Sequence, residues 1–473
     1  MTYLLHTYGC QMNVRDSEML AALLEANGLS PAQGEDDADL ILINTCAVRG
    51  KAEDKAIGKA RLLCVEKRKR PVLVGFAGCM AQRLGPELFK RVPLLDFAFG
   101  TRAAANIPQL LQRLRAGETR VAYLDPPTNI PENPCQHLAP NISAFVTVLL
   151  GCNRRCAYCV VPEVRGPEYS RPAAEIIEEI KSLVNAGARE ITLLGQSVMR
   201  YGALKGVQEF RSSEVQNEAD AASPPEKIQP SAISHQPFTE AFPRLLHAIC
   251  QIPGLRRLRF FSGHPSGCTD ELLRAFRTLP QLCHHLHLPV QSGSNAILKA
   301  MRRGYTREAY LDTLRRLRDA VPDIAITSDI IVGFPGETED DFEQTRSLLR
   351  EAAFDNTFIF KYSPRPNTPA ALLDDNVPAA EKMRRNKLLL ADQDLLGQHL
   401  NDKLLHTTLE ILVEGPSLRN PSRWAGRTST NKIVHFTNPG SIIPGDLLNV
   451  TITRVKPQTL YGAIAKHGGG NHE

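Results

Sequence analysis

Three cysteines stand close together near the middle of the chain, at Cys152, Cys156 and Cys159. They follow the apolar run 145–150 and Gly151, and a run of this kind is typical of a buried strand. Three thiolates can hold three irons of a four-iron cluster, which leaves the fourth iron open to an outside ligand such as S-adenosylmethionine. Zinc is the alternative, but structural zinc uses four closed ligands, and no fourth Cys or His stands nearby. The pattern predicts a 4Fe-4S cluster.

Alternating strands and helices surround this motif and must position it. Six apolar runs between residues 140 and 375 are expected to be strands: 145–150, 190–194, 255–261, 284–290, 324–332 and 357–362. Helical patterns separate them, as at 173–186, where Gly187 supplies the stop. Six such units predict an incomplete TIM-like barrel. Active sites of parallel barrels lie at the carboxyl ends of the strands, where the three cysteines are expected.

The first 117 residues predict a second parallel α/β unit. Strands are expected at 3–7, 40–44, 72–77 and 97–100, and Cys10, Cys46 and Cys79 each follow one of the first three. Carboxyl ends of parallel strands meet at one edge of a sheet, so the three thiols could converge there. Buried packing cysteines are the alternative, since cysteine is commonly buried.

The C-terminal part predicts a small antiparallel β-barrel after a helical linker at 379–398. Alternating apolar and polar residues at 407–413, 432–436 and 447–455 predict strands, with Gly and Pro turns between them. From Asp402 to Lys466 there are eight Lys and Arg against four Asp and Glu. This balance suits either phosphate binding or a solvated surface. Six basic residues are expected to face outward together: Arg419, Arg423, Arg427, Lys432, Arg454 and Lys456.

Composition sets the remaining expectations. Apolar residues make up 42% and charged residues 23% of the 473 residues, and neither a long apolar stretch nor a signal peptide is evident. We expect a cytoplasmic monomer that does not enter the membrane. Eleven cysteines, an odd number, point to metal chemistry rather than disulfides. Residues 203–240 predict a disordered insertion and 125–134 a linker. The expected domains are 1–117, 138–378 and 396–467.

Several short motifs together resemble the methylthiotransferases, most closely the MiaB family of tRNA 2-methylthio-N(6)-dimethylallyladenosine synthases. The resemblance covers nearly the whole chain apart from the insertion. The motifs are Tyr8-Gly9-Cys10-Gln11-Met12-Asn13, Gly151–Cys159 with Tyr158, Val164-Arg165-Gly166, Ser170-Arg171-Pro172, His287–Ser294, Asp329–Thr338 and Tyr362–Pro366.

The resemblance implies a radical-SAM enzyme that adds a 2-methylthio group to N(6)-dimethylallyladenosine at position 37 of tRNA. It implies two 4Fe-4S clusters, one on Cys152, Cys156 and Cys159 that binds S-adenosylmethionine, and one on Cys10, Cys46 and Cys79 that delivers sulfur. A C-terminal TRAM barrel would grip the RNA, and a sulfur donor and an electron donor protein would be partners. Related enzymes that act on threonylcarbamoyladenosine in tRNA or on a ribosomal-protein aspartate are the alternatives, and Gln11-Met12-Asn13 favours the first interpretation.

Five further residues are candidates for contact with S-adenosylmethionine or substrate: Gly195, Gln196, Gln291, Ser292 and Asp329. Each ends a predicted barrel strand, but a tight turn explains Gly195-Gln196 equally well, and Asp329 could be a structural cap. Arg165 and Arg171 could neutralise a carboxylate or phosphate or form surface salt bridges. His264 stands in a Gly-His-Pro sequence where the family has Ser-His-Pro. Five cysteines match no ligand pattern and are expected to pack: Cys64, Cys135, Cys250, Cys268 and Cys283.

Overall fold

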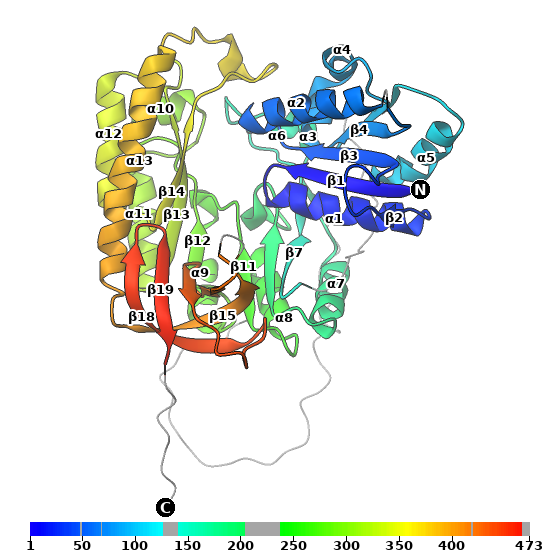
Figure 1. Cartoon of the computed structure of the whole chain (residues 1–473). Coiled ribbons are helices and arrows are strands. Elements are labelled where there is room, and N and C mark those ends of the chain that lie inside the picture. Colours follow the sequence, from blue (N-terminus) through cyan, green and yellow to red (C-terminus); the bar gives the residue numbers. More distant parts are fainter. Residues whose placement is uncertain (48–49, 68, 126–140, 204–236, 418–419, 466–473) are drawn as a thin grey trace, which may run out of the picture.

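The chain folds into three units that meet around a common centre (Figure 1). The structure is a computed structural model. It describes residues 1–47, 50–67, 69–125, 141–203, 237–417 and 420–465. In Figure 1 the N-terminal unit is blue to cyan, the central unit green to yellow and the C-terminal unit orange to red.

The N-terminal unit is a six-stranded parallel sheet with helices packed against it. The strand order is β2-β1-β3-β4-β5-β6, and every pairing is parallel, as predicted. Its strands are β1 (Thr2–Tyr8), β2 (Ser30–Pro31), β3 (Leu40–Thr45), β4 (Leu73–Ala77), β5 (Phe97–Phe99) and β6 (Val121–Tyr123). Its helices are α1 (Gln11–Ala26), α2 (Gly50–Glu66), α3 (Cys79–Leu84), α4 (Glu87–Arg91) and α5 (Ile107–Arg115). The sequence missed the short strands β2 and β6.

The central unit is the predicted open barrel of six parallel strands. Two three-stranded sheets, β7-β10-β11 and β12-β13-β14, are joined by a parallel bridge between Leu258 and Leu282. The strands are β7 (Ser143–Thr147), β10 (Glu190–Leu194), β11 (Arg257–Phe260), β12 (His285–His287), β13 (Ala325–Val332) and β14 (Asn356–Lys361). A small hairpin of β8 (Leu149–Leu150) and β9 (Tyr169–Ser170) extends the first strand.

Helices cover the outside of this barrel because their apolar stripes match the outward strand residues. On the first long helix, Ile176, Ile180, Leu183 and Val184 are buried in the same core as Ile191 and Leu258, at the helical spacing that the sequence predicted. The helices of the central unit are α6 (Val161–Arg165), α7 (Ala173–Asn185), α8 (Ala241–Cys250), α9 (Asp270–Thr278), α10 (Asn295–Ala300), α11 (Arg307–Ala320) and α12 (Glu339–Ala352), of which α6 lines the central cavity instead of covering the barrel.

The C-terminal unit is a closed barrel of five strands in the order β15-β16-β17-β19-β18. Four pairings are antiparallel, as predicted, but β17 and β19 pair in parallel. The strands are β15 (Thr408–Pro416), β16 (Trp424–Thr428), β17 (Ile433–Phe436), β18 (Leu447–Lys456) and β19 (Thr459–Ile464).

The predicted helical linker is α13 (Ala379–Asp402), and it packs against both neighbouring units. Thr357 of β14 donates to the Gln393 side chain (2.9 Å), whereas Asn401 donates to the carbonyl of Lys456 (2.8 Å). A Cβ at Gly397 would lie 2.8 Å from the carbonyl oxygen of Pro457. The helix therefore holds the C-terminal barrel against the last strand of the central one, as Figure 1 shows along its left side.

Some predictions concern segments that the structure does not describe. The 125–134 linker lies almost wholly outside the described residues, as does most of the 203–240 insertion. Residues 237–240 are described: Arg274 lies 4.2 Å above the Phe238 ring, and Thr239 donates to Glu271. Within the described part of the chain, no helix has the length and apolar character needed to cross a membrane.

Candidate active site

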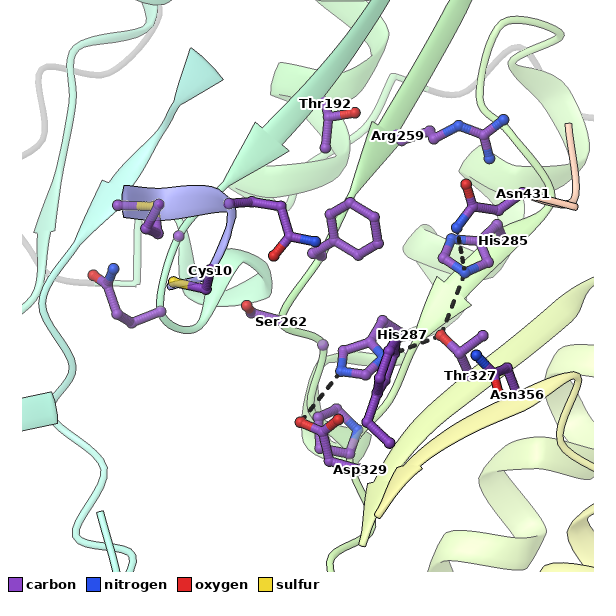
Figure 2. A pocket seen from close by; sticks show the side chains of 18 of the residues that line it. Cys10, Thr192, Arg259, Ser262, His285, His287, Thr327, Asp329, Asn356 and Asn431 are labelled. Carbon is purple, nitrogen blue, oxygen red and sulfur yellow. Dashed lines mark hydrogen bonds and ion pairs between the residues drawn. The ribbon is translucent and has the colours of Figure 1, made fainter. Parts of the chain in front are cut away.

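All six cysteines of the two predicted sets line one cavity of about 930 Å³ between the three units. We call the part lined by Cys10, Cys46, Cys79, Cys152, Cys156 and Cys159 the sulfur end. Figure 2 looks into this cavity from close by, with Cys10 on the N-terminal unit facing side chains from the central barrel. The two sets, which are separated by more than 70 residues in sequence, therefore line the same cavity.

The loop that carries Cys152, Cys156 and Cys159 is fixed by backbone contacts. Gly151 has φ +74°, and a Cβ there would lie 2.0 Å from the carbonyl oxygen of Pro167, so only glycine allows the turn into Cys152. At Ala157 the amide donates to the carbonyl of Met301 (2.9 Å), and its own carbonyl accepts from Ala370 (2.8 Å). The loop is thereby held between two other segments of the barrel mouth.

A buried arginine and a backbone amide donate hydrogen bonds to the sulfurs of this loop. Arg303, which is 7% exposed, donates to Cys156 Sγ (3.3 Å) and to the Tyr305 hydroxyl (2.9 Å). The backbone amide of Arg154 donates to Cys152 Sγ (3.4 Å). Donors and positive charge favour the thiolate form, which is the form that binds metal.

The other three cysteines come together because their strands are neighbours in the sheet. Cys10 follows β1, Cys46 follows β3 and Cys79 follows β4, which lie side by side. Before Cys79, Gly78 has φ +87°, and a Cβ there would lie 2.3 Å from Asn44 Oδ1. The tight turn after β4 therefore depends on glycine.

A buried amide pair supports Cys10. Asn13 Oδ1 accepts from the backbone amide of Cys10 (3.2 Å), and Asn13 Nδ2 donates to Asn44 Oδ1 (3.2 Å). Asn44 in turn donates to the carbonyl of Asn13 (2.9 Å). The Asn of the Gln11-Met12-Asn13 motif thus positions the cysteine that precedes it.

The thiol pKa values shift in opposite directions within the cavity, and Cys10 differs from the more deeply buried cysteines of both sets. A hydrogen bond with Cys46 lowers the pKa of Cys10 to about 6. Burial raises the pKa of Cys159 to about 12, and it also raises the pKa of Cys152 and of Cys79. Metal binding displaces such protons, because the coordinating sulfur is a thiolate.

The donor sets fit clusters better than single ions. Among the residues described, no group of three His, Cys, Asp or Glu could hold one metal ion. In a four-iron cluster each thiolate binds a different iron, so the sulfurs of one site need not converge on a point. Three thiols per site, glycine turns before Cys79 and Cys152, and N–H donors aimed at sulfur all suit a cluster.

Arg165 is buried, contrary to the surface alternative. Its Nε donates to Cys79 Sγ (3.0 Å), and its Nη1 and Nη2 donate to Asp16 (3.3 and 2.5 Å). Arg171 is also buried and pairs with Glu179 (2.7 Å). Both arginines therefore neutralise carboxylates of the protein.

Four of the five further candidates line the cavity: Gly195, Gln196, Gln291 and Asp329. Gln196 Oε1 is buried without a hydrogen-bond partner, so this oxygen is available to accept a hydrogen bond from a bound ligand. Ser292, in contrast, is fully buried and is not among the described residues that line the cavity. Its Oγ lies 3.3 Å from Thr345 Oγ1. Its position indicates a packing role.

The opposite part of the cavity carries a group of polar side chains that the sequence analysis missed. We call it the floor: Glu190, Thr192, Arg259, His285, His287, Thr327, Asn356, Asn431 and Lys432, all of which line the cavity. Figure 2 shows most of these side chains around one space. His285 Nε2 contacts Thr327 Oγ1 (3.3 Å), and its Nδ1 is buried without a partner. Burial holds the pKa of His285 well below its usual value, so the ring is neutral.

The C-terminal barrel closes this floor with the turn between β16 and β17. Arg259 pairs with Glu190 (3.0 Å) and donates to the carbonyls of Ser429 (2.7 Å) and Thr428 (2.5 Å). Lys432 pairs with Asp355 (2.7 Å). These contacts place the C-terminal barrel in the wall of the central site.

The prediction that six basic residues of the C-terminal unit face outward together was partly wrong. Lys432 and Arg427 line the cavity, and Arg427 pairs with Glu414 (2.8 Å). Arg423 and Arg454 are exposed and flank Tyr461, at 5.5 and 3.9 Å from the ring centre. Lys456 is exposed, and Arg419 lies outside the described residues. Local sequence could not reveal which turn docks on the central barrel.

His264 also lines the cavity, despite the glycine before it. Its Nδ1 contacts Ser266 Oγ (2.9 Å), its Nε2 is buried without a partner, and burial lowers its pKa to about 3. Of the five cysteines without a ligand pattern, Cys64, Cys250, Cys268 and Cys283 are buried, as predicted. Cys135 lies outside the described residues.

Comparisons with known proteins agree with this architecture. Three family models match the chain: the radical SAM superfamily over residues 146–349, the uncharacterized protein family UPF0004 over 2–100, and the TRAM domain over 403–465. Two structures of the radical S-adenosylmethionine methyltransferase TsrM from Kitasatospora setae match with TM-scores of 0.53 and 0.54 at 14% identity. They cover 78% of this chain and 77% and 75% of theirs, which shows a shared fold. Fold and site define a radical-SAM enzyme.

Relatives that match over nearly the whole chain identify one family within this class. The tRNA-2-methylthio-N(6)-dimethylallyladenosine synthase of Akkermansia muciniphila is 41% identical over 96% of this chain and 97% of its own length. Proteins of the same name from Geotalea uraniireducens and Carboxydothermus hydrogenoformans are 41% and 42% identical, over 98% of this chain and 98% and 99% of theirs. The chain belongs to this family of tRNA-2-methylthio-N(6)-dimethylallyladenosine synthases.

Proposed function

We propose that this enzyme adds a methylthio group to carbon 2 of N(6)-dimethylallyladenosine at position 37 of tRNA. The observation that supports it best is the single cavity lined by both cysteine sets. Replacing a ring hydrogen by a sulfur group needs a site that breaks the C–H bond and a site that supplies sulfur, both within reach of one base. The relatives' name favours this substrate over threonylcarbamoyladenosine and over a ribosomal-protein aspartate.

The cofactors are assigned to the sulfur end. Membership of the radical SAM superfamily implies a 4Fe-4S cluster and S-adenosylmethionine, and we assign them to Cys152, Cys156 and Cys159. We assign a second 4Fe-4S cluster to Cys10, Cys46 and Cys79. When bound, these groups supply the radical and sulfur chemistry, while the protein positions them. Gln196, Gln291 and Asp329 line the same space and are proposed to contact S-adenosylmethionine or the base.

The protein's own residues prepare the space between the two sites. Arg303 and the Arg154 amide donate to thiol sulfurs and hold the loop. The floor presents neutral imidazole and amide groups, His285 and Asn431, which can each donate and accept hydrogen bonds. These neutral hydrogen-bonding groups suit an uncharged purine, and the turn between β16 and β17 closes the floor beneath them.

The exposed C-terminal surface is proposed to grip the RNA. Arg423 and Arg454 can neutralise phosphates, and Tyr461 between them offers an aromatic face. We propose domain boundaries of 1–117, 138–378 and 396–467. We also propose that the enzyme works as a cytoplasmic monomer, where tRNA, a sulfur donor and an electron donor protein are present.

Nucleoside mass spectrometry tests the proposed reaction. The chain is expressed in a bacterial strain that makes N(6)-dimethylallyladenosine but lacks the methylthio modification, and tRNA is digested to nucleosides. We expect 2-methylthio-N(6)-dimethylallyladenosine to appear. A methylthio group on threonylcarbamoyladenosine or on a ribosomal-protein aspartate would instead support one of the alternatives.

A further inference from the structure

Arg165 belongs to the central barrel, yet its side chain serves the N-terminal site. It is the last residue of α6, the helix that follows the loop of Cys152, Cys156 and Cys159. All three of its nitrogen atoms donate to the N-terminal unit: Nε to Cys79 Sγ (3.0 Å), and Nη1 and Nη2 to the carboxylate of Asp16 (3.3 and 2.5 Å). Its side chain is 4% exposed. A charged side chain this buried must be neutralised, and here a carboxylate and a thiol sulfur share that role.

Asp16 connects this contact to Cys10, another cysteine of the N-terminal site. It lies on α1, the helix that begins directly after Cys10, whereas Cys79 begins α3. Arg165 therefore joins α1, α3 and α6 at one point. An N–H donor on a ligand sulfur and a neighbouring positive charge both stabilise the more reduced, more negative state of a cluster. A neighbouring carboxylate, here that of the partly buried Asp16, acts in the opposite direction.

We propose that Arg165 is a positioning residue for the N-terminal site and that, balanced by Asp16, it sets the reduction potential of the cluster held there. This inference rests on the proposed second cluster. It means that the N-terminal site is complete only when the central barrel is docked against it. The potential of the sulfur-supplying site is then set by a residue on α6, the helix that follows the loop of the other site.

The experiment isolates the N-terminal site in the full-length chain. The parent variant carries Cys152→Ala, Cys156→Ala and Cys159→Ala, is reconstituted anaerobically, and is titrated with an external one-electron reductant while the cluster is followed by electron paramagnetic resonance. Arg165→Met should make reduction at least tenfold less favourable, which is a midpoint about 59 mV more negative for a one-electron couple. Asp16→Asn removes the opposing charge and should shift the midpoint in the positive direction.

Arg15→Met is the matched control. Arg15 is also 4% exposed, and it crosses the same boundary to pair with Glu179 of α7 (3.2 Å). It should leave the midpoint where the parent has it. If Arg165→Met and Asp16→Asn give the midpoint of Arg15→Met, the inference is wrong although the second cluster stands. If Arg165→Met binds no iron, Asp16→Asn decides, since it keeps Arg165 and the three cysteines of the N-terminal site. A parent variant without iron contradicts the second cluster itself.

Discussion

The sulfur end lies between the N-terminal and central units, whereas the floor lies between the central and C-terminal units, and the two are built in different ways. At the sulfur end, six thiols follow strand ends and turns. Two of the cysteines directly follow Gly78 and Gly151, where a side chain would not fit. At the floor, charged side chains such as Arg259 and Lys432 bind groups on a neighbouring unit. The sulfur end therefore gathers reactive groups, whereas the charged side chains of the floor join the central and C-terminal units. Changes at the sulfur end should remove chemistry, and changes at the floor should remove stability.

The largest effect is expected from removing the three cysteines that lie on one loop. Changing Cys152, Cys156 and Cys159 together to Ala should lower the iron content from about eight to about four per chain after reconstitution, because one of two four-iron sites is lost. Reductive cleavage of S-adenosylmethionine should disappear. Iron analysis and chromatography of the cleavage products measure both. Retained cleavage would mean that this loop is not the S-adenosylmethionine site.

The second set should separate cleavage from product formation. Changing Cys10, Cys46 and Cys79 together to Ala should again leave about four irons, but here cleavage of S-adenosylmethionine should continue while the methylthio product stops. The matched control is Cys64→Ser, a buried cysteine of the same unit with no ligand pattern, which should keep all its iron. Product formed by the triple variant would falsify the sulfur-delivery role of the N-terminal site.

At the floor, a buried ion pair should matter more than an exposed one. Arg259→Met leaves the Glu190 carboxylate buried without its arginine, and it removes two donors to the C-terminal turn. Breaking a buried pair in this way costs about 3–5 kcal/mol. Urea unfolding should show this as a lower transition midpoint.

The control for the floor is Arg316→Ala, which removes an exposed pair with Asp270 (2.6 Å). Exposed pairs contribute about 0–1 kcal/mol, so its midpoint should stay close to that of the unaltered chain. The double variant Arg259→Met with Glu190→Gln should recover part of the loss. Equal midpoints for Arg259→Met and Arg316→Ala would show that the floor does not hold the units together.

The smallest effect is expected on the outer surface of the C-terminal barrel. Changing Arg423 and Arg454 to Ala should weaken tRNA binding and flatten its salt dependence, by about 0.7–0.9 in slope for each phosphate that is no longer neutralised. Iron content should not change. Filter binding at several salt concentrations measures the slope, with Lys181→Ala on α7 as the control, since that lysine is exposed and pairs with its helix neighbour Glu178. An unchanged slope would place the RNA-binding surface elsewhere.

The sequence by itself determined most of the elements and one of the two cysteine sets. Cys152, Cys156 and Cys159 lie on one loop, so their spacing alone brings them together. Alternation along 284–290 also carries a signal for the floor: Leu286 and Leu288 are fully buried in the core, while His285 and His287 line the cavity. Period-two alternation assigns strand residues to opposite faces, whatever the rest of the chain does.

Only the tertiary structure decided what depends on how distant segments pack. Cys10, Cys46 and Cys79 meet because β1, β3 and β4 are neighbours, and strand order is a property of the whole sheet. Arg165 acts on Cys79 from another unit. Lys432 faces the cavity rather than solvent because the turn after β16 docks on the central barrel. Such interactions join residues far apart in the chain, and their positions depend on the packing of entire units, which no local pattern of residues records.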